Sequence, residues 1–273
     1  MHVDRRGGTK PLRLIGIIPA AGLGSRLQPL PFSKELYPAG FQTVNGNLRV
    51  SPISLHLIKS LQQAKVNHVF FVINPQKTDI PRYYLNGKEL GMNFSYLYQP
   101  KQKGMVDALA QVTSWIWGDD DTLLLFGMPD TYFQPPSLFE KMIEVMKNNQ
   151  DLHVVLGVFP TSSWWKLGMV RFKEQENGIG HVLDIHDKPK VKPKTKFAWG
   201  TAVWRLSFQQ YLTRCQDEYK GENELVLGDV FMRAKTDGMK IGCVVGKEYE
   251  DLGTLEDLMK FMKRMSKGQK GDQ

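Results

Sequence analysis

The sequence is poor in cysteine and has no long apolar run. Its two cysteines, Cys215 and Cys243, lie far apart without the spacing of metal ligands, a pattern typical of ordinary thiols in a reducing compartment. The first ten residues are polar and charged, and the apolar run over residues 12–18 is too short for a signal peptide or a membrane span. We therefore expect a soluble, cytoplasmic protein.

Acidic residues are in the minority. The 36 Lys and Arg residues outnumber the 28 Asp and Glu residues, which gives a formal net charge of +8 over 273 residues. Such a charge attracts nucleic acids, anionic membranes and phosphorylated small molecules alike. No RNP-like or KH-like signature is present, and the basic stretch 260–270 contains the Gly, Ser and Gln typical of a frayed, solvated terminus. We expect phosphorylated small molecules as partners, and neither nucleic acid nor a membrane.

Strand-like and helix-like segments alternate along the chain. Five apolar runs have the continuous character of buried parallel strands, and four other segments carry apolar residues at helical spacing. This alternation predicts an α/β fold with a Rossmann-like, mostly parallel twisted sheet flanked by helices. The predicted strands are 12–18, 69–73, 122–126, 154–158 and 241–245, and the predicted helical stripes are 53–61, 105–116, 138–145 and 255–262.

The pattern changes between residues 169 and 205. Short strand-like pieces there are joined by a Gly-rich turn and by a stretch rich in Pro and Lys, which predicts an inserted antiparallel section beside the parallel sheet, as a wall or lid over a site. Because no repeat or typical linker is present, we expect a single domain over residues 12–266, with tails at 1–11 and 267–273. The strand-like pieces are 168–172, 181–185 and 197–204.

A long loop rich in small residues follows the first predicted strand. It lacks the third glycine and immediate helix of a dinucleotide-binding GxGxxG motif, and it has no Gly-Lys-Ser/Thr of a Walker A loop. Small residues let backbone N–H groups approach phosphates, and Arg26 and Lys34 add the positive charge that a phosphoryl-transfer site needs. An ordinary Gly/Pro surface loop is the alternative interpretation.

The run GLGSRLQPLPFSKELYPAG, residues 22–40, resembles the signature GxG(T/S)RxxPxTxxxPKxLxP of the sugar-phosphate nucleotidylyltransferases. The likeness is greatest to glucose-1-phosphate thymidylyltransferases, with features shared by UTP–glucose-1-phosphate uridylyltransferases. Pro31 stands where Thr is common. The resemblance implies the nucleotide-diphospho-sugar transferase fold and the joining of an NTP to a sugar 1-phosphate with release of pyrophosphate. It implies a nucleotide-binding role for Ala21, Gly22, Gly24 and Ser25, and a catalytic role for Arg26 and Lys34.

Two aspartates follow predicted strands at the edge where α/β sheets bind ligands. Asp130 comes after strand 122–126 and Asp251 after strand 241–245. Two carboxylates from separate loops suit Mg²⁺, although either one alone is more commonly a turn or cap residue. Asp130 in its Pro-Asp context resembles the family's (G/P)D motif, and Asp251-Leu-Gly-Thr resembles its D(I/T)GT motif. The resemblance implies that both hold the catalytic Mg²⁺.

Further segments resemble the family's base and sugar motifs. The run from Gln99 resembles QxxxxGxxxA, which implies that Gln99 and Gly104 bind the base, whereas an exposed loop Gln is the alternative. Asp187-Lys188-Pro189 resembles the EKP motif, which implies a sugar contact for Asp187 and a phosphate contact for Lys188. Similar matches imply sugar-side roles for Gly168, Gly200 and Glu224, with a structural cap as the alternative for Glu224.

Three departures from the family pattern, Leu167, Asp187 and Trp199, cluster on the sugar side. The resemblance implies dTTP or UTP and glucose 1-phosphate as substrates, and a homo-oligomer is in keeping with the family. The departures leave two alternatives open: a cytidylyltransferase for another phosphorylated substrate, and a catalytically silent protein that binds nucleotide sugars.

Overall fold

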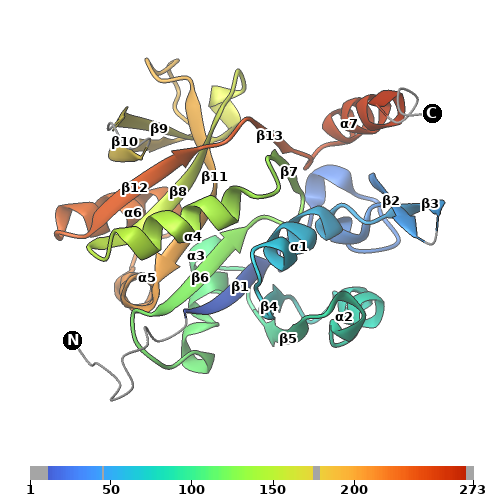
Figure 1. Ribbon diagram of the computed structural model, residues 1–273, viewed down its shortest axis with the longest axis horizontal. Coiled ribbons are helices and arrows are strands. Elements are labelled where there is room, and N and C mark those ends of the chain that lie inside the picture. Colours follow the sequence, from blue (N-terminus) through green and yellow to red (C-terminus); the bar gives the residue numbers. More distant parts are fainter. Residues whose placement is uncertain (1–11, 45, 175–178, 269–273) are drawn as a thin grey trace.

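The computed structural model describes residues 12–44, 46–174 and 179–268, and a nine-stranded sheet runs through its centre (Figure 1). The strand order is β5-β4-β1-β6-β11-β8-β12-β10-β9. These strands are β1 (Arg13–Pro19), β4 (His68–Ile73), β5 (Asn93–Tyr98), β6 (Thr122–Gly127), β8 (Leu152–Pro160), β9 (Gly168–Glu174), β10 (Gly180–Asp187), β11 (Phe197–Arg205) and β12 (Lys240–Val245).

The sheet is mostly parallel, as predicted. Strands β4 and β6 flank β1 in parallel, β5 extends β4, and β8 pairs in parallel with β12. Strands β1 and β6 are apolar and buried almost throughout, because helices cover both faces of the sheet.

The predicted antiparallel section is present, but the position predicted for its third strand was wrong. Only β9 and β10 form the outer edge, whereas β11 lies inside the sheet, antiparallel to β6 on one side and β8 on the other. From Gly200 to Arg205 every residue of β11 is buried, so this segment can serve as a central strand and does not form a lid.

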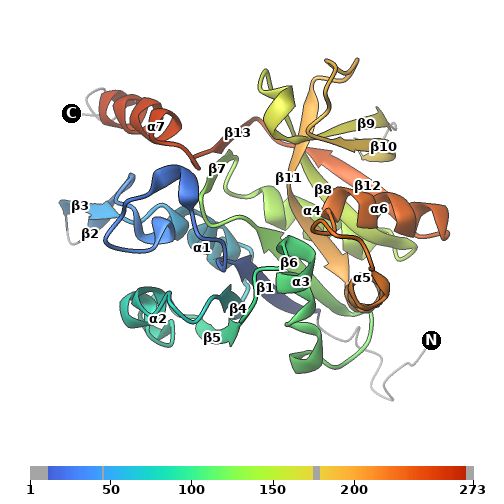
Figure 2. The same ribbon diagram turned by 180° about the vertical axis from the view of Figure 1, so that it is seen from behind.

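Helices form a layer on each face of the sheet, and each layer has its own apolar core. One core contains α3 (Met105–Ala110), α5 (Leu206–Glu218) and α6 (Leu227–Thr236), which lie in front of the sheet in Figure 2. The other contains α1 (Ser54–Gln63), α2 (Asp79–Tyr84) and α4 (Leu138–Asn148), of which α1 and α4 lie in front in Figure 1. The predicted stripe 105–116 is a shorter helix than expected, because α3 ends at Ala110 and a 3₁₀ turn follows over Thr113–Trp115.

Two small antiparallel sheets and the last helix complete the fold. One sheet is the hairpin of β2 (Gly40–Val44) and β3 (Asn47–Ser51), and the other pairs β7 (Thr131–Gln134) with β13 (Glu248–Asp251). Helix α7 (Leu255–Gly268) follows β13, so the basic stretch predicted to fray from residue 260 is helical as far as Gly268. The predicted tail 1–11 and residues 269–273 of the predicted tail 267–273 lie outside the described residues, whereas residues 267 and 268 belong to α7. Among the described residues, no helix combines the length and the apolar character needed to span a bilayer.

Candidate active site

The two aspartates predicted from the sequence meet on the β7–β13 ribbon, between the main sheet and α7 (Figure 1). Asp251 pairs with Thr131, and the N–H of Leu252 donates to the carbonyl of Asp130 at 3.0 Å. Asp130 is only 4% exposed. Burial, followed by the nearby charge of Asp130, raises the pKa of Asp251. The site therefore contains a buried and a half-buried carboxylate, and ionisation of Asp251 is disfavoured.

Lys34 reaches Asp130 from the loop after β1. It lies in a 3₁₀ turn (Lys34–Leu36), and its ammonium group forms an ion pair with Oδ2 of Asp130. Burial alone would lower the pKa of Lys34, but the charges of Asp130, Glu35 and Asp251 outweigh that effect and raise it. Lys34 therefore stays charged beside the acidic pair.

Gly24 allows Lys34 to take this path. Its φ of 65° lies in the left-handed region, and a Cβ there would come within 3.0 Å of the Lys34 side chain. The neighbouring Gly22 and Ser25 are exposed, so their backbone groups are open to a ligand, whereas Ala21 is buried and its carbonyl accepts from Asn74 Nδ2 at 2.8 Å. The loop is thus held in place at Ala21, whereas its exposed rim contains Gly22 and Ser25.

Arg26 lies on the other side of the acidic pair. Its Nη1 is 4.0 Å from Oδ2 of Asp251, and its side chain is 57% exposed, which leaves the guanidinium free to bind an anion. The Asp251 carboxylate is oriented by the N–H of Gly253, which donates to Oδ1 at 2.9 Å. Arg26 and Lys34, which the sequence predicted to act together, therefore flank the same two carboxylates.

A buried ion pair that sequence reasoning missed supports the Lys34 turn. Lys77 Nζ donates to both carboxylate oxygens of Glu35, at 2.7 and 2.8 Å, and both side chains are less than a tenth exposed. The hydroxyl of Ser54, at the start of α1, donates to the carbonyl of Glu35 at 2.6 Å. The residue next to Lys34 is thus anchored to two other segments. An acidic residue directly after Lys34 was the one signal for this pair in the sequence.

A cavity of about 670 Å³ opens beside the glycine-rich loop. Gln99 is buried in its wall, and its amide NH₂ donates to the carbonyl of Gly104 at 3.0 Å and to Asp107 Oδ2 at 2.7 Å. Gly104 has a φ of 90°, and a Cβ there would lie 2.5 Å from Oε2 of Glu224. The predicted base-binding residues Gln99 and Gly104 are thus brought together with the loop. The cavity is lined by Pro19, Ala21, Gly22, Gln99, Gln102, Gly104, Met105, Ala108, Met128 and Glu224.

The residues predicted to act on the sugar side are less closely gathered. Lys188 is exposed, and its ammonium lies 3.9 Å from the carboxylate of Asp187. Burial raises the pKa of Asp187, and the charge of Glu224 contributes in the same direction. Glu224 therefore lies near both Asp187 and Gly104, and it lines the cavity that contains the base-binding residues.

Two of the predicted glycines pack against aromatic rings. A Cβ on Gly168 would collide with the indole nitrogen of Trp199, and a Cβ on Gly200 would collide with the ring of Tyr249. Packing by itself accounts for glycine at these positions. Their predicted contact with a sugar stays a prediction.

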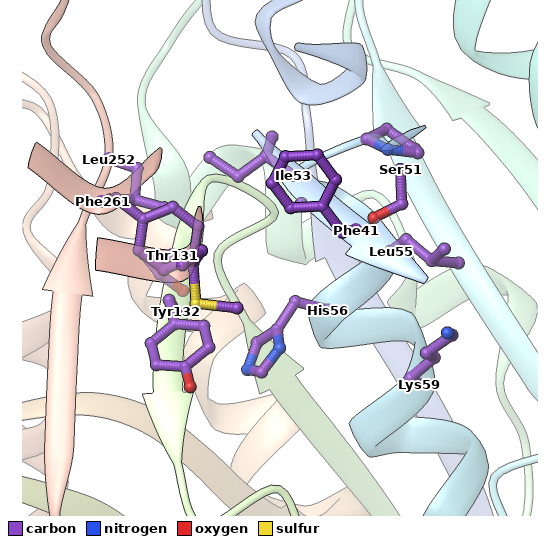
Figure 3. Close-up of a pocket in the computed structure, with 13 residues that line it drawn as sticks. Phe41, Ser51, Ile53, Leu55, His56, Lys59, Thr131, Tyr132, Leu252 and Phe261 are labelled. Atoms are coloured by element: carbon purple, nitrogen blue, oxygen red, sulfur yellow. The ribbon is translucent and has the colours of Figure 1, made fainter. Parts of the chain in front are cut away.

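A mostly apolar pocket of about 470 Å³ lies against the same ribbon (Figure 3). Thr131 and Leu252, the residues after the two aspartates, line it together with His56 of α1. Burial lowers the pKa of His56, which keeps its ring neutral, and its Nε2 lies 3.1 Å from the carbonyl of Phe133. His56 is thus a half-buried structural residue.

The match to a known family covers almost the whole chain. A family model described as nucleotidyl transferase matches residues 15–268. The chain belongs to this nucleotidyl transferase family. Among curated relatives, the UTP–glucose-1-phosphate uridylyltransferase of Staphylococcus haemolyticus is 24% identical over 91% of this chain and 97% of its own length. The glucose-1-phosphate thymidylyltransferase of Mycolicibacterium smegmatis is 26% identical over 67% of this chain and 58% of its own length.

Solved structures share the fold. A crystal structure of UDP-glucose pyrophosphorylase complexed with UDP-glucose has a TM-score of 0.77 and 19% identity, and the match covers 94% of this chain and all of that chain. The predicted family and the predicted fold type of this nucleotidyl transferase are confirmed.

One further basic residue of this nucleotidyl transferase was missed by sequence reasoning. Lys166 lies in the 3₁₀ turn Trp164–Lys166, and its ammonium is 3.1 Å from Oδ2 of Asp257 in α7. Lys166 and Asp251 line the same pocket of about 490 Å³, so a second lysine stands near the acidic pair. Its two tryptophan neighbours match no motif, which is why the sequence did not single it out.

Proposed function

We propose that this nucleotidyl transferase transfers the nucleotidyl group of UTP or dTTP to a sugar 1-phosphate, with glucose 1-phosphate as the favoured acceptor. The observation that carries the proposal is the meeting of Asp130 and Asp251 with Lys34 and Arg26 beside the cavity that contains Gln99 and Gly104. The names of the relatives support the choice of substrates, because they are uridylyl- and thymidylyltransferases for glucose 1-phosphate.

The acidic pair fits a Mg²⁺ ion. Carboxylate oxygens are the ligands that this hard cation prefers. Burial, and after it the charge of Asp130, raises the pKa of Asp251, and a bound cation would favour the ionised carboxylate. Within the described parts of the chain no group of three or more His, Cys, Asp or Glu side chains is placed to hold a metal, so phosphate oxygens and water would complete the coordination. Bound there, Mg²⁺ would neutralise charge on the triphosphate.

The reaction needs positioning and positive charge. A non-bridging oxygen of the sugar 1-phosphate attacks the α-phosphorus of the NTP, the new P–O bond forms, and the bond to the β-phosphate oxygen breaks to release pyrophosphate. The nucleophile is already an anion at neutral pH, so no side chain has to remove a proton. Arg26, on the exposed rim of the loop, is suited to bind the departing pyrophosphate, and Lys34 stabilises charge at the acidic pair.

Two regions of the molecule suggest how the substrates divide. The cavity at Gln99 and Gly104 would take the nucleoside, and the side containing Asp187 and Lys188 would take the sugar phosphate. Trp199 and Leu167 replace residues common in the family, and both lie next to Gly168. Both replacements therefore lie on the side assigned to the acceptor sugar.

Pyrophosphate release tests the proposal. The protein is mixed with Mg²⁺, each of UTP, dTTP and CTP, and a panel of sugar 1-phosphates. We expect turnover with UTP or dTTP and glucose 1-phosphate, and a loss of at least about 100-fold in kcat for Asp130→Asn, because one metal-binding oxygen and the partner of Lys34 are removed.

The control is Asp151→Asn, which changes an exposed aspartate just before β8 that pairs with Lys240, and it should leave turnover unchanged. Full activity of folded Asp130→Asn would contradict the metal site. Binding of UDP-glucose without any pyrophosphate release would instead indicate a silent nucleotide-sugar-binding protein, and turnover with CTP and a non-sugar phosphate would indicate a cytidylyltransferase.

A further inference from the structure

The side-chain amide of Gln99 is held in one orientation. The residue is 3% exposed, and its backbone N–H donates to the carbonyl of Ile73 at 2.8 Å, which fixes its position at the end of β5. Its NH₂ group has two hydrogens and faces two acceptors, the carbonyl of Gly104 at 3.0 Å and Oδ2 of Asp107 at 2.7 Å. With both donors used, the carbonyl oxygen Oε1 is the polar atom that Gln99 can offer to the cavity it lines.

Asp107 prevents the amide from turning over. An ionised carboxylate is an acceptor only, and so is the Gly104 carbonyl. A flipped Gln99 would therefore place Oε1 against two other acceptors and would lose both hydrogen bonds. A neutral partner that can both donate and accept would not impose this constraint. The orientation of Gln99 thus depends on the chemical type of the residue at position 107.

An acceptor at this position distinguishes pyrimidines. Uracil and thymine carry a hydrogen on N3 and can donate it to Oε1 of Gln99. Cytosine has a lone pair on N3, so the same contact would bring two acceptors together and leave both unpaired. A glutamine free to turn would serve either base, by presenting Oε1 to one and NH₂ to the other.

We propose that Asp107 is a positioning residue that fixes the Gln99 amide and thereby makes the site select uracil or thymine over cytosine. This inference rests on the proposed function, since it concerns the base of the NTP. It assigns the selectivity to a side chain that need not touch the nucleotide, because Asp107 acts through its 2.7 Å hydrogen bond with Gln99.

The test is the ratio of kcat/KM for UTP to kcat/KM for CTP, with glucose 1-phosphate as acceptor. We expect the wild-type protein to favour UTP and Asp107→Ala to lower the ratio by about tenfold or more, because the Gln99 NH₂ group loses the shorter of its two hydrogen bonds and turns more easily. Asp107→Asn should also lower the ratio, because its amide can donate to a turned Gln99 as well as accept from the unturned one. General damage to the fold would reduce turnover with both nucleotides and leave their ratio unchanged.

Asp217→Ala is the matched control. Asp217 is exposed and lines a neighbouring cavity together with Asp107, so the variant removes an equal charge nearby and leaves the two partners of the Gln99 NH₂ in place. Its ratio should equal that of the wild type. An unchanged ratio in folded Asp107→Ala would overturn the proposal.

Calorimetric titration with UTP and with CTP separates this proposal from the proposed function. A protein that releases no pyrophosphate but binds UTP more tightly than CTP, and loses that preference in Asp107→Ala, would contradict the proposed reaction and support the role of Asp107. Equal affinity of the wild type for UTP and CTP would overturn the role of Asp107 even if pyrophosphate is released.

Discussion

The Asp251 carboxyl group lies among neighbours that oppose its ionisation. Burial is the largest influence, the charge of Asp130 adds to it, and together they raise the pKa despite Arg26. A carboxyl group whose pKa rises on folding holds its proton more tightly in the native state. As the pH rises through that folded pKa, the native state loses stability relative to the unfolded state. At neutral pH the ionised carboxylate of Asp251 therefore lowers the stability of the native state. The same negative charge helps the site to attract a cation.

Asp251→Asn should separate stability from activity. Without divalent metal at pH 7 we expect its melting temperature to rise by roughly 2–4 °C, because the unfavourable charge is removed while an amide oxygen can still accept from Gly253. With Mg²⁺ we expect kcat to fall by about 100-fold or more. Differential scanning fluorimetry and pyrophosphate release measure the two effects. At a pH near 4 the gain in melting temperature should shrink, because the raised pKa of Asp251 favours its protonated form as the pH falls. A lower melting temperature for the variant at pH 7 would contradict the assigned electrostatics.

Some residues of the site could be predicted from the sequence and others could not. Arg26, Lys34, Asp130 and Asp251 stand in ordered motifs next to strand ends, so local pattern was enough to name them and the structure brings them together. Asp107 could not be identified in this way, because its role depends on which hydrogen bonds the buried Gln99 makes, and no spacing in the sequence expresses that choice.

At the level of elements, the Glu35–Lys77 pair connects the Lys34 turn to the segment after β4. Burial raises the pKa of Glu35 even though Lys77 opposes it, and burial lowers the pKa of Lys77. Each charge thus compensates for the unfavourable burial of the other. The pair is therefore not an independent source of stability. When one partner is removed, the other stays buried without a compensating charge.

Lys77→Met removes the positive charge while keeping a long side chain. We expect it to lower the free energy of unfolding at pH 7 by about 3–5 kcal/mol, because Glu35 stays buried without a counter-charge. The loss should be smaller at pH 5.5, since Glu35 can take up a proton there and its raised pKa makes this easier. The double variant Glu35→Gln/Lys77→Met should recover most of the stability. Urea unfolding followed by fluorescence measures all three.

The matched control is Lys240→Met, which breaks the exposed pair with Asp151. Its unfolding midpoint should stay close to that of the wild type, because exposed ion pairs are screened by water. Equal effects of the buried and exposed variants would contradict the role given to burial.

Strands and helices could be predicted from the sequence where a single hydrophobic periodicity runs through the whole segment. All five predicted parallel strands exist, because both of their faces are buried and their sequences are continuously apolar. The ribbon of β7 and β13 was not predicted. Its strands are four residues each and pair across more than a hundred residues of chain, so neither has a periodic pattern of its own. Yet this ribbon places Asp130 beside Asp251.

At the scale of the whole molecule, the excess positive charge is unevenly distributed over the surface. The connection between β10 and β11 carries five exposed lysines and no acidic residue over positions 188–196. It projects from the upper end of β11 in Figure 1. Because Phe197 pairs with Pro160 at the end of β8, this connection stands at the same edge of the sheet as the ends of the parallel strands. Anionic substrates approaching that edge meet a positive field.

Replacing Lys190, Lys192 and Lys194 together with Gln should therefore slow substrate capture without changing the chemical step. We expect kcat/KM for the NTP to fall a few-fold at about 20 mM salt, with kcat unchanged. The difference should nearly vanish at about 0.5 M salt, where charges more than a few ångströms apart are screened.

The comparison variant replaces Lys147, Lys235 and Lys240, which are near the opposite edge of the sheet, where β12 begins at Lys240 beside Leu152. It carries the same change in net charge. If both triple variants lower kcat/KM equally, net charge alone governs capture and the placement of the lysine-rich connection has no special effect. A loss confined to the variant at 190, 192 and 194 means that the field at the strand ends guides the triphosphate to the site.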